Sequence, residues 1–163
     1  MRRDEGMKRK FVLSLVVVLA IACLGASAAF AQMGGHVMVL PTDLKWADVP
    51  SLPPGAKIAV IEGPPNEAVP FTFRLKFPAG YKIPAHSHPA IERVTVLSGA
   101  LNFGMGDKLD TAKTRQMTVG SVIIMPAQTH HFGWTNEETI VQLSGMGPWG
   151  VTYVNPEDDP RKK

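Results

Sequence analysis

The stretch GYKIPAHSHPAIERVTVLSG, residues 80–99, combines a strand pattern with side chains that bind metals. Residues two apart on a strand point to the same face, so His86 and His88 are expected to project to one side. Pro89 interrupts this strand, and Glu92 follows His88 at a spacing of four. Two imidazoles and a carboxylate on one face offer nitrogen and oxygen ligands that suit Mn, Fe, Ni, Cu or Zn. The segment therefore predicts part of a metal site on β-strands.

Apolar residues outside this stretch also tend to alternate with polar ones, which is the period of a β-strand. The alternating segments are 71–77, 92–99, 121–126, 139–145 and 150–154. Pro- and Gly-rich turn signals separate them about every 8–12 residues, as in an all-β sandwich or barrel. The longest helical pattern is the short segment 43–49. The sequence therefore predicts an all-β fold with a single domain.

A third imidazole is available from PAQTHHFGW, residues 126–134, where two histidines are adjacent. Neighbouring residues on a strand face opposite ways, so only one of His130 and His131 can join the others. A lone histidine is more often a surface or hydrogen-bonded residue than a ligand. The pattern HxHxxxE followed by a later histidine reverses that expectation and favours a metal site.

The spacing of Gly80, His86, His88, Glu92 and Gly99 resembles the first motif of the cupin superfamily at every position. The resemblance covers roughly residues 56 to 145. It implies an antiparallel jelly-roll β-barrel of six to eight strands, with a metal inside one open end. It also implies a homodimer, assembled by strand exchange or edge pairing.

The second cupin motif is matched only in part. Gly120, Pro126 and His131 stand where the family has its first Gly, its Pro and its His. Gln128 replaces the second glycine of the motif, and Thr135 replaces an asparagine. Neither departure affects a ligand, but a glutamine in place of glycine suggests a differently shaped turn.

The resemblance implies one divalent transition metal per chain, either Mn, Fe, Ni, Cu or Zn, with His86, His88, Glu92 and His131 as ligands. Counting along the second motif selects His131, and alternation then turns His130 to the opposite face. Glu92 is also the predicted catalytic residue, because a carboxylate ligand can shift or act as a base. The metal identity is not determined by these residue types.

Strand parity predicts which side chains line a substrate pocket next to the ligands: Phe73, Phe103, Met125, Trp134 and Met146. These residues suggest an apolar or aromatic small molecule; the alternative is that they only fill the barrel. The cupin fold hosts dioxygenases, decarboxylases, isomerases and binding proteins, so the fold alone does not select a reaction. We expect a metal-dependent oxidoreductase, either a dioxygenase or an oxalate-oxidase-like enzyme. A non-catalytic periplasmic protein that binds a metal or small ligand, and a metal that only stabilises the barrel, are the alternatives.

Residues 1–31 have the pattern of a cleaved signal peptide. A basic segment precedes the apolar run 11–24, and AFA ends at Ala31, which predicts cleavage after that residue. The run is shorter than the roughly 20 residues that span a bilayer. We therefore expect a periplasmic or secreted protein with no membrane segment after cleavage. An uncleaved anchor and a lipoprotein modified at Cys23 are alternatives.

The remaining chain is expected to divide into an N-terminal arm (32–55), a cupin barrel (56–154) and a C-terminal tail (155–163). Residues 1–31 contain five of the 17 basic and two of the 14 acidic side chains, so twelve of each sign remain. This balance gives no support for nucleic-acid binding. The basic end of the tail is expected to be a frayed, solvated terminus.

Overall fold

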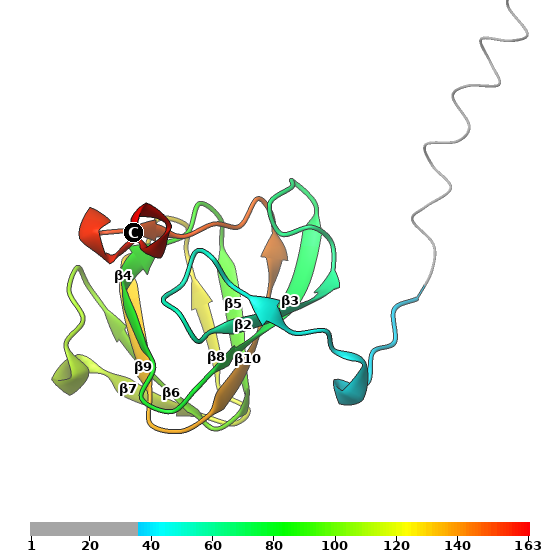
Figure 1. Cartoon of the computed structure of the whole chain (residues 1–163), viewed down its shortest axis with the longest axis horizontal. Coiled ribbons are helices and arrows are strands. Elements are labelled where there is room, and N and C mark those ends of the chain that lie inside the picture. The colour runs from blue at the N-terminus through cyan, green and yellow to red at the C-terminus, as the bar shows by residue number, and fades with distance from the viewer. Residues whose placement is uncertain (1–35) are drawn as a thin grey trace, which may run out of the picture. The chain divides into compact units, whose positions relative to one another are not determined.

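The computed structural model describes residues 36–163, in which residues 38–163 form one compact unit built from two antiparallel sheets (Figure 1). The six-stranded sheet has the order β1 (Ala47–Asp48), β2 (Lys57–Glu62), β3 (Pro70–Phe77), β10 (Thr139–Met146), β5 (Glu92–Ser98) and β8 (Val122–Met125). The five-stranded sheet has the order β11 (Thr152–Tyr153), β4 (Lys82–Ser87), β9 (His131–Thr135), β6 (Ala100–Met105) and β7 (Arg115–Thr118). The predicted all-β class is confirmed.

The remaining regular elements are short 3-10 turns: η1 (Pro41–Asp43), η2 (Thr111–Lys113), η3 (Pro156–Asp158) and η4 (Pro160–Lys162). Within residues 36–163, no helix has the length and apolar character needed to cross a bilayer. The predicted signal peptide, its cleavage site and Cys23 lie outside the described residues.

The chain changes sheet at most of its connections. From β3 to β6 it alternates between the two sheets, and it alternates again from β7 to β10. This connectivity places β10 between β3 and β5, although these strands are far apart in sequence. Two facing antiparallel sheets joined in this way form a jelly roll, which confirms the fold that the resemblance implied. The expected number of six to eight strands was too low, because the described residues form eleven strands, two of them only two residues long.

The core lies between the sheets and follows the alternation in sequence. In β3, the side chains of Phe71, Phe73, Leu75 and Phe77 are buried, whereas the residues between them are half-buried. Burying one such side chain stabilises the fold by roughly 1.5–3 kcal/mol. The strand therefore has one face in the core, and the site described below lies at that face.

The turn before β9 keeps a glycine-like backbone at a residue that is not glycine. Gln128 has φ +61°, in the left-handed region where glycine is favoured. Its amide donates to the carbonyl of His88 at 2.8 Å, so this turn is linked to the segment that carries two of the predicted ligands. The glutamine was expected to change the shape of the turn. Its φ shows no such change, because Gln128 adopts the left-handed conformation that a glycine would adopt.

Replacing Gln128 by glycine is expected to raise the free energy of unfolding by about 0.5–1 kcal/mol, because a residue with a Cβ is strained at this φ. Thermal unfolding of the metal-free protein measures the change. The matched control is Gln116→Gly, at an exposed position within β7, where glycine should lower stability by about 0.5–1 kcal/mol. A loss of stability in both variants would contradict the strain.

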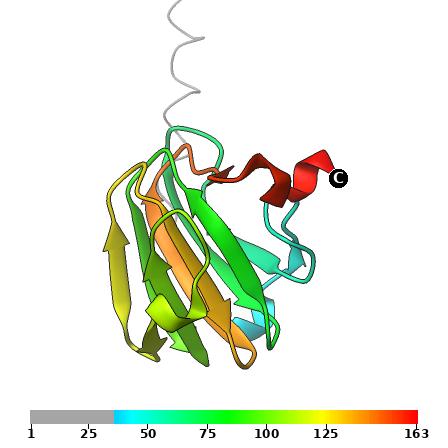
Figure 2. The same ribbon diagram turned by 90° about the vertical axis from the view of Figure 1, so that its left-hand side faces the viewer.

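Parts of the expected arm and tail pack against the barrel. In the arm, β1 pairs with β2, and Val49 and Leu52 belong to the core. The tail is not a frayed end, because Asp159 is buried and its carboxylate accepts a hydrogen bond from Nε of Arg161 at 2.7 Å. Figure 2 shows the C-terminal turns beside the segment 48–56, with which they share a groove.

Candidate metal centre

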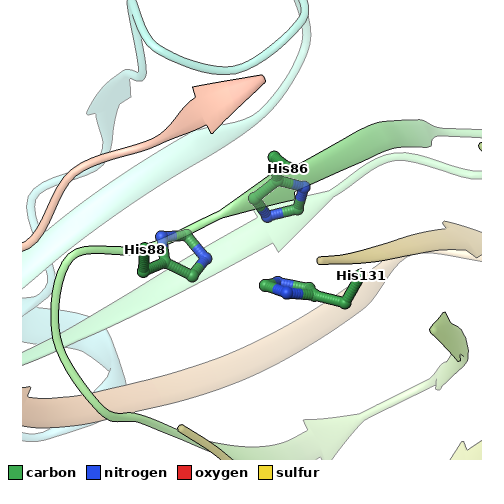
Figure 3. A group of neighbouring side chains, drawn as sticks. All are labelled: His86, His88 and His131. Atoms are coloured by element: carbon green, nitrogen blue, oxygen red, sulfur yellow. The ribbon is translucent and has the colours of Figure 1, made fainter. Parts of the chain in front are cut away.

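Three histidines from neighbouring strands of one sheet converge inside the barrel (Figure 3). His86 lies in β4 and pairs directly with His131, the first residue of β9. His88 follows β4, and Glu92 is the first residue of β5 in the other sheet. The ligand atoms of the three histidines all lie within 4.8 Å of one another, and all four side chains are buried.

Backbone carbonyls fix the tautomer of each imidazole. The Nδ1 atoms of the three rings lie 2.7–2.9 Å from carbonyl oxygens: His86 from that of Pro84, His88 from that of Gly150, and His131 from that of Thr129. A carbonyl oxygen only accepts, so each Nδ1 carries the proton and donates it. Each Nε2 is therefore left with a free lone pair, which is the form of histidine that binds a metal.

Glu92 completes this donor set. Its Oε1 lies 3.3 Å from Nε2 of His88, and its Oε2 lies 3.9 Å from Nε2 of His131. The indole Nε1–H of Trp149 donates to Oε1 at 3.0 Å. The carboxylate therefore lies beside the three imidazole nitrogens, with one of its oxygens already hydrogen-bonded.

Burial keeps the three imidazoles neutral. It lowers the pKa of His88 to about 4 and the pKa of His86 well below its usual value, where the neighbouring histidines add to the effect. Burial also lowers the pKa of His131, although Glu92 opposes this change. The pKa of Glu92 itself is raised by burial and lowered in part by His131 and the Trp149 hydrogen bond.

The donor set fits a divalent transition metal. Neutral imidazole lone pairs face a buried carboxylate, and a cation among them would offset the cost of burying that carboxylate. Two ligands at about 2.1 Å from one ion can lie at most about 4.2 Å apart. A small movement of the histidine side chains would therefore close the group around a metal.

The four predicted ligands border a cavity of about 50 Å³. Apart from the four predicted ligands, its walls are mainly aliphatic and aromatic, and include Leu75, Phe77, Val94, Leu101 and Leu143. Of the residues predicted to line a substrate pocket, Phe103 and Met125 border this cavity.

The other three predicted pocket residues lie elsewhere. Phe73 points inward but is separated from the cavity by Trp149, whose ring meets it edge-on at 5.0 Å. Trp134 lies three residues after His131 and so faces the opposite side of β9, where it donates to Thr114. Met146 lies at the end of β10 and is exposed. Trp134 and Met146 were placed on the wrong face of their strands: each lies an odd number of residues from an inward-facing residue, His131 in β9 and Leu143 in β10.

Two features of the site were missed in the sequence. Trp149 hydrogen-bonds to Glu92 and stacks on His88, with ring centroids 5.0 Å apart. The next residue, Gly150, supplies the carbonyl that accepts from His88. Neither Trp149 nor Gly150 stands at a fixed distance from the two motifs in the sequence, so only the structure shows that they contact the site.

His130 lies outside the site, as alternation predicts. Its side chain is exposed, and its Nδ1 lies 2.6 Å from a carboxylate oxygen of Asp107. The group of possible metal-binding histidines contains His131 and not His130. The register chosen from the second motif agrees with this placement.

In protein stripped of metal by a chelator, the free energy of unfolding should fall as the pH is lowered from about 6.5 to about 4. The pKa of His88 is about 4 in the folded chain and 6.5 at its ordinary value, so the unfolded chain takes up the proton first. This difference corresponds to at most about 3 kcal/mol. His86 and His131 act in the same direction, and Glu92, with its raised pKa, acts in the opposite one.

Urea titrations at pH 7 and pH 5 measure this dependence. In the variant His88→Gln it should be weaker, because one of the three groups is removed. Equal stability of the parent protein at the two pH values would contradict the expected proton uptake.

Comparison with known proteins identifies the fold. No protein-family model and no curated protein matches the sequence. The polyketide cyclase RemF of Streptomyces resistomycificus is similar in structure, with a TM-score of 0.65 and 18% identity over 78% of this chain and 92% of its own. An RmlC-like cupin of Shewanella frigidimarina has a TM-score of 0.54 and 14% identity over 68% and 89%. An oxalate oxidase has a TM-score of 0.55 and 22% identity over 77% and 67%. The chain therefore has the jelly-roll fold of the cupin superfamily.

Proposed function

We propose that this chain is a metal-dependent oxidoreductase that acts on a small organic molecule, as a dioxygenase or an oxalate-oxidase-like enzyme. The observation that carries the proposal is the donor set of three neutral imidazoles and a buried carboxylate at the wall of an apolar cavity. A bound metal would supply redox chemistry and open positions for substrate. The protein supplies the ligands and a shell that excludes water.

The cavity wall supports metal-centred chemistry over acid–base catalysis by the protein. Among the described residues, its only ionisable side chains are the four predicted ligands. Arg74 donates a hydrogen bond to the side chain of Gln142, and Arg93 is exposed. Neither arginine lines the cavity. Reactions that need a separate general acid or base in the cavity wall would find none among the described residues.

The size of the cavity limits the substrate. A water molecule needs roughly 10–15 Å³ of such space, so 50 Å³ admits a few water-sized groups. An aromatic ring would need the walls to move. This space favours dioxygen and a small acid over the aromatic substrate that the side-chain types had suggested.

The comparison with oxalate oxidase adds support at the level of the fold. That protein shares the jelly roll at 22% identity, and a cyclase shares it as well. Four protein ligands on an octahedral ion would leave two positions for other ligands. We propose that a small acid and dioxygen bind there side by side.

We also propose that the protein is exported and forms a homodimer. The basic and apolar segments that precede Ala31 support export. The side chains of Val122 and Ile124 are exposed on β8, at the edge of the larger sheet, and support pairing between copies. Sequencing of the mature N-terminus and light scattering of the purified protein test these two points.

The main experiment uses the protein purified from a periplasmic preparation without a chelating tag. Elemental mass spectrometry counts bound metal, and oxygen uptake is measured with small carboxylic acids and with phenolic compounds. About one Mn, Fe, Ni or Cu per chain, with uptake that is lost in His88→Ala, would support the proposal. One metal per chain without turnover of any compound would favour a binding protein instead.

A further inference from the structure

Trp149 contacts two of the four predicted ligands although it is not a ligand itself. Its Nε1–H donates to Oε1 of Glu92 at 3.0 Å. Its ring stacks on His88, with 5.0 Å between centroids and 20° between planes. In the part of the chain that the structure describes, this is the one side-chain hydrogen bond that Glu92 accepts. The orientation of the carboxylate therefore depends on a single indole N–H.

The indole is held in place from two directions. Phe73 packs against it edge-on, with 5.0 Å between centroids and 69° between planes. The backbone amide of Trp149 donates to the carbonyl of Pro65 at 2.6 Å, in the loop between β2 and β3. The ring is thus fixed by a core side chain and by a backbone bond, and is a rigid donor toward Glu92.

The two carboxylate oxygens have different surroundings. Oε1 accepts the indole N–H and lies 3.3 Å from Nε2 of His88, whereas Oε2 accepts no hydrogen bond from the described residues and lies 3.9 Å from Nε2 of His131. Groups that hydrogen-bond to a ligand orient it, and their loss typically costs 10–100-fold in metal affinity. An N–H on one oxygen also leaves that oxygen a weaker donor to a metal.

We propose that Trp149 is a positioning residue for the predicted metal site: its N–H on Oε1 fixes the carboxylate of Glu92 so that it would ligate a metal through a single oxygen. With three imidazoles, ligation by one oxygen leaves two positions on an octahedral ion. Ligation by both oxygens would leave one. Trp149 thereby sets how many small ligands bind side by side. The inference rests on the metal binding of the proposed function and not on its redox chemistry.

The test counts exchangeable water on Mn²⁺ in the loaded full chain, from the broadening of its electron paramagnetic resonance lines in ¹⁷O-enriched water. The variant replaces Trp149 by 3-benzothienylalanine, which keeps the ring shape and has sulfur in place of N–H. Trp149→Phe is the second variant. We expect about two waters in the parent protein and about one in both variants, with Mn²⁺ binding weakened by about 10-fold or more.

Trp134→Phe is the matched control. That indole also donates a side-chain hydrogen bond, to Thr114 at 3.3 Å, but it does not border the cavity. Its water count and affinity should equal those of the parent. Two waters and unchanged affinity in the Trp149 variants would overturn the inference.

The outcomes also separate this inference from the proposed function. A parent protein that binds Mn²⁺ but consumes no oxygen would contradict only the oxidoreductase assignment. A parent protein that cannot be loaded with Mn²⁺ would overturn both.

Discussion

Replacing His88 by alanine is expected to lower metal affinity by more than about 100-fold, since loss of a group that merely orients a ligand already costs 10–100-fold. The substitution removes one of three Nε2 lone pairs that lie within 4.8 Å of one another. Elemental mass spectrometry of the purified variant and competition with a chromophoric chelator measure the loss. Circular dichroism should show that the sheets are retained.

His130→Ala is the control for this substitution. His130 is adjacent in sequence to a predicted ligand, but it is exposed and bound to Asp107. Its removal should leave metal content nearly unchanged. Equal losses from His88→Ala and His130→Ala would show that the assignment of residues 130 and 131 is wrong.

Replacing Phe73 by alanine should lower the free energy of unfolding by about 3–5 kcal/mol, the usual cost of truncating a buried phenylalanine. Its side chain is 0% exposed, stacks on Phe71 and meets Trp149 edge-on. Because the neighbours cannot fill the space fully, the lost contacts and the remaining cavity both contribute. Urea titration of the metal-free protein measures the change.

Phe71→Ala separates the effect on stability from the effect on the metal site. Phe71 is as deeply buried, at 1% exposure, and its aromatic contact is with Phe73. Both variants should lose stability, but only Phe73→Ala removes the ring behind Trp149. We therefore expect weaker metal binding in Phe73→Ala than in Phe71→Ala. The opposite order would contradict the supporting role of Phe73.

The fold and the convergence of three histidines could be predicted because both depend on local spacing. Alternation of apolar residues predicts the strands, and the spacing of His86 and His88 places two imidazoles on one face. Counting along the second motif selected His131, which the structure places with them. The second motif also predicts a glycine at position 128. The residue there is Gln128, and its left-handed φ shows that the turn keeps the backbone conformation of a glycine.

The cavity wall was harder to predict, for two physical reasons. Trp134 and Met146 were assigned to the wrong face, although the inward side chain of His131 already implies that Trp134 points outward. Phe73 has the right direction, but Trp149 covers it. The position of Trp149 depends on a backbone hydrogen bond to Pro65, more than 80 residues earlier in the chain. Such long-range pairing leaves no periodic signal in the sequence.

The carbonyl groups that hold the three imidazoles have a consequence for how this protein can change. Each Nδ1 proton is accepted by a main-chain oxygen, of Pro84, Thr129 or Gly150. Every amino acid carries that oxygen, so substitutions at these positions that preserve the backbone path would keep the acceptors. The arrangement of the three imidazoles is in this respect insensitive to the side chains at those three positions. For the same reason, the three histidines are a suitable starting point for engineering: nearby side chains other than Trp149, which holds Glu92, can be varied without designing new hydrogen-bond partners for the imidazoles.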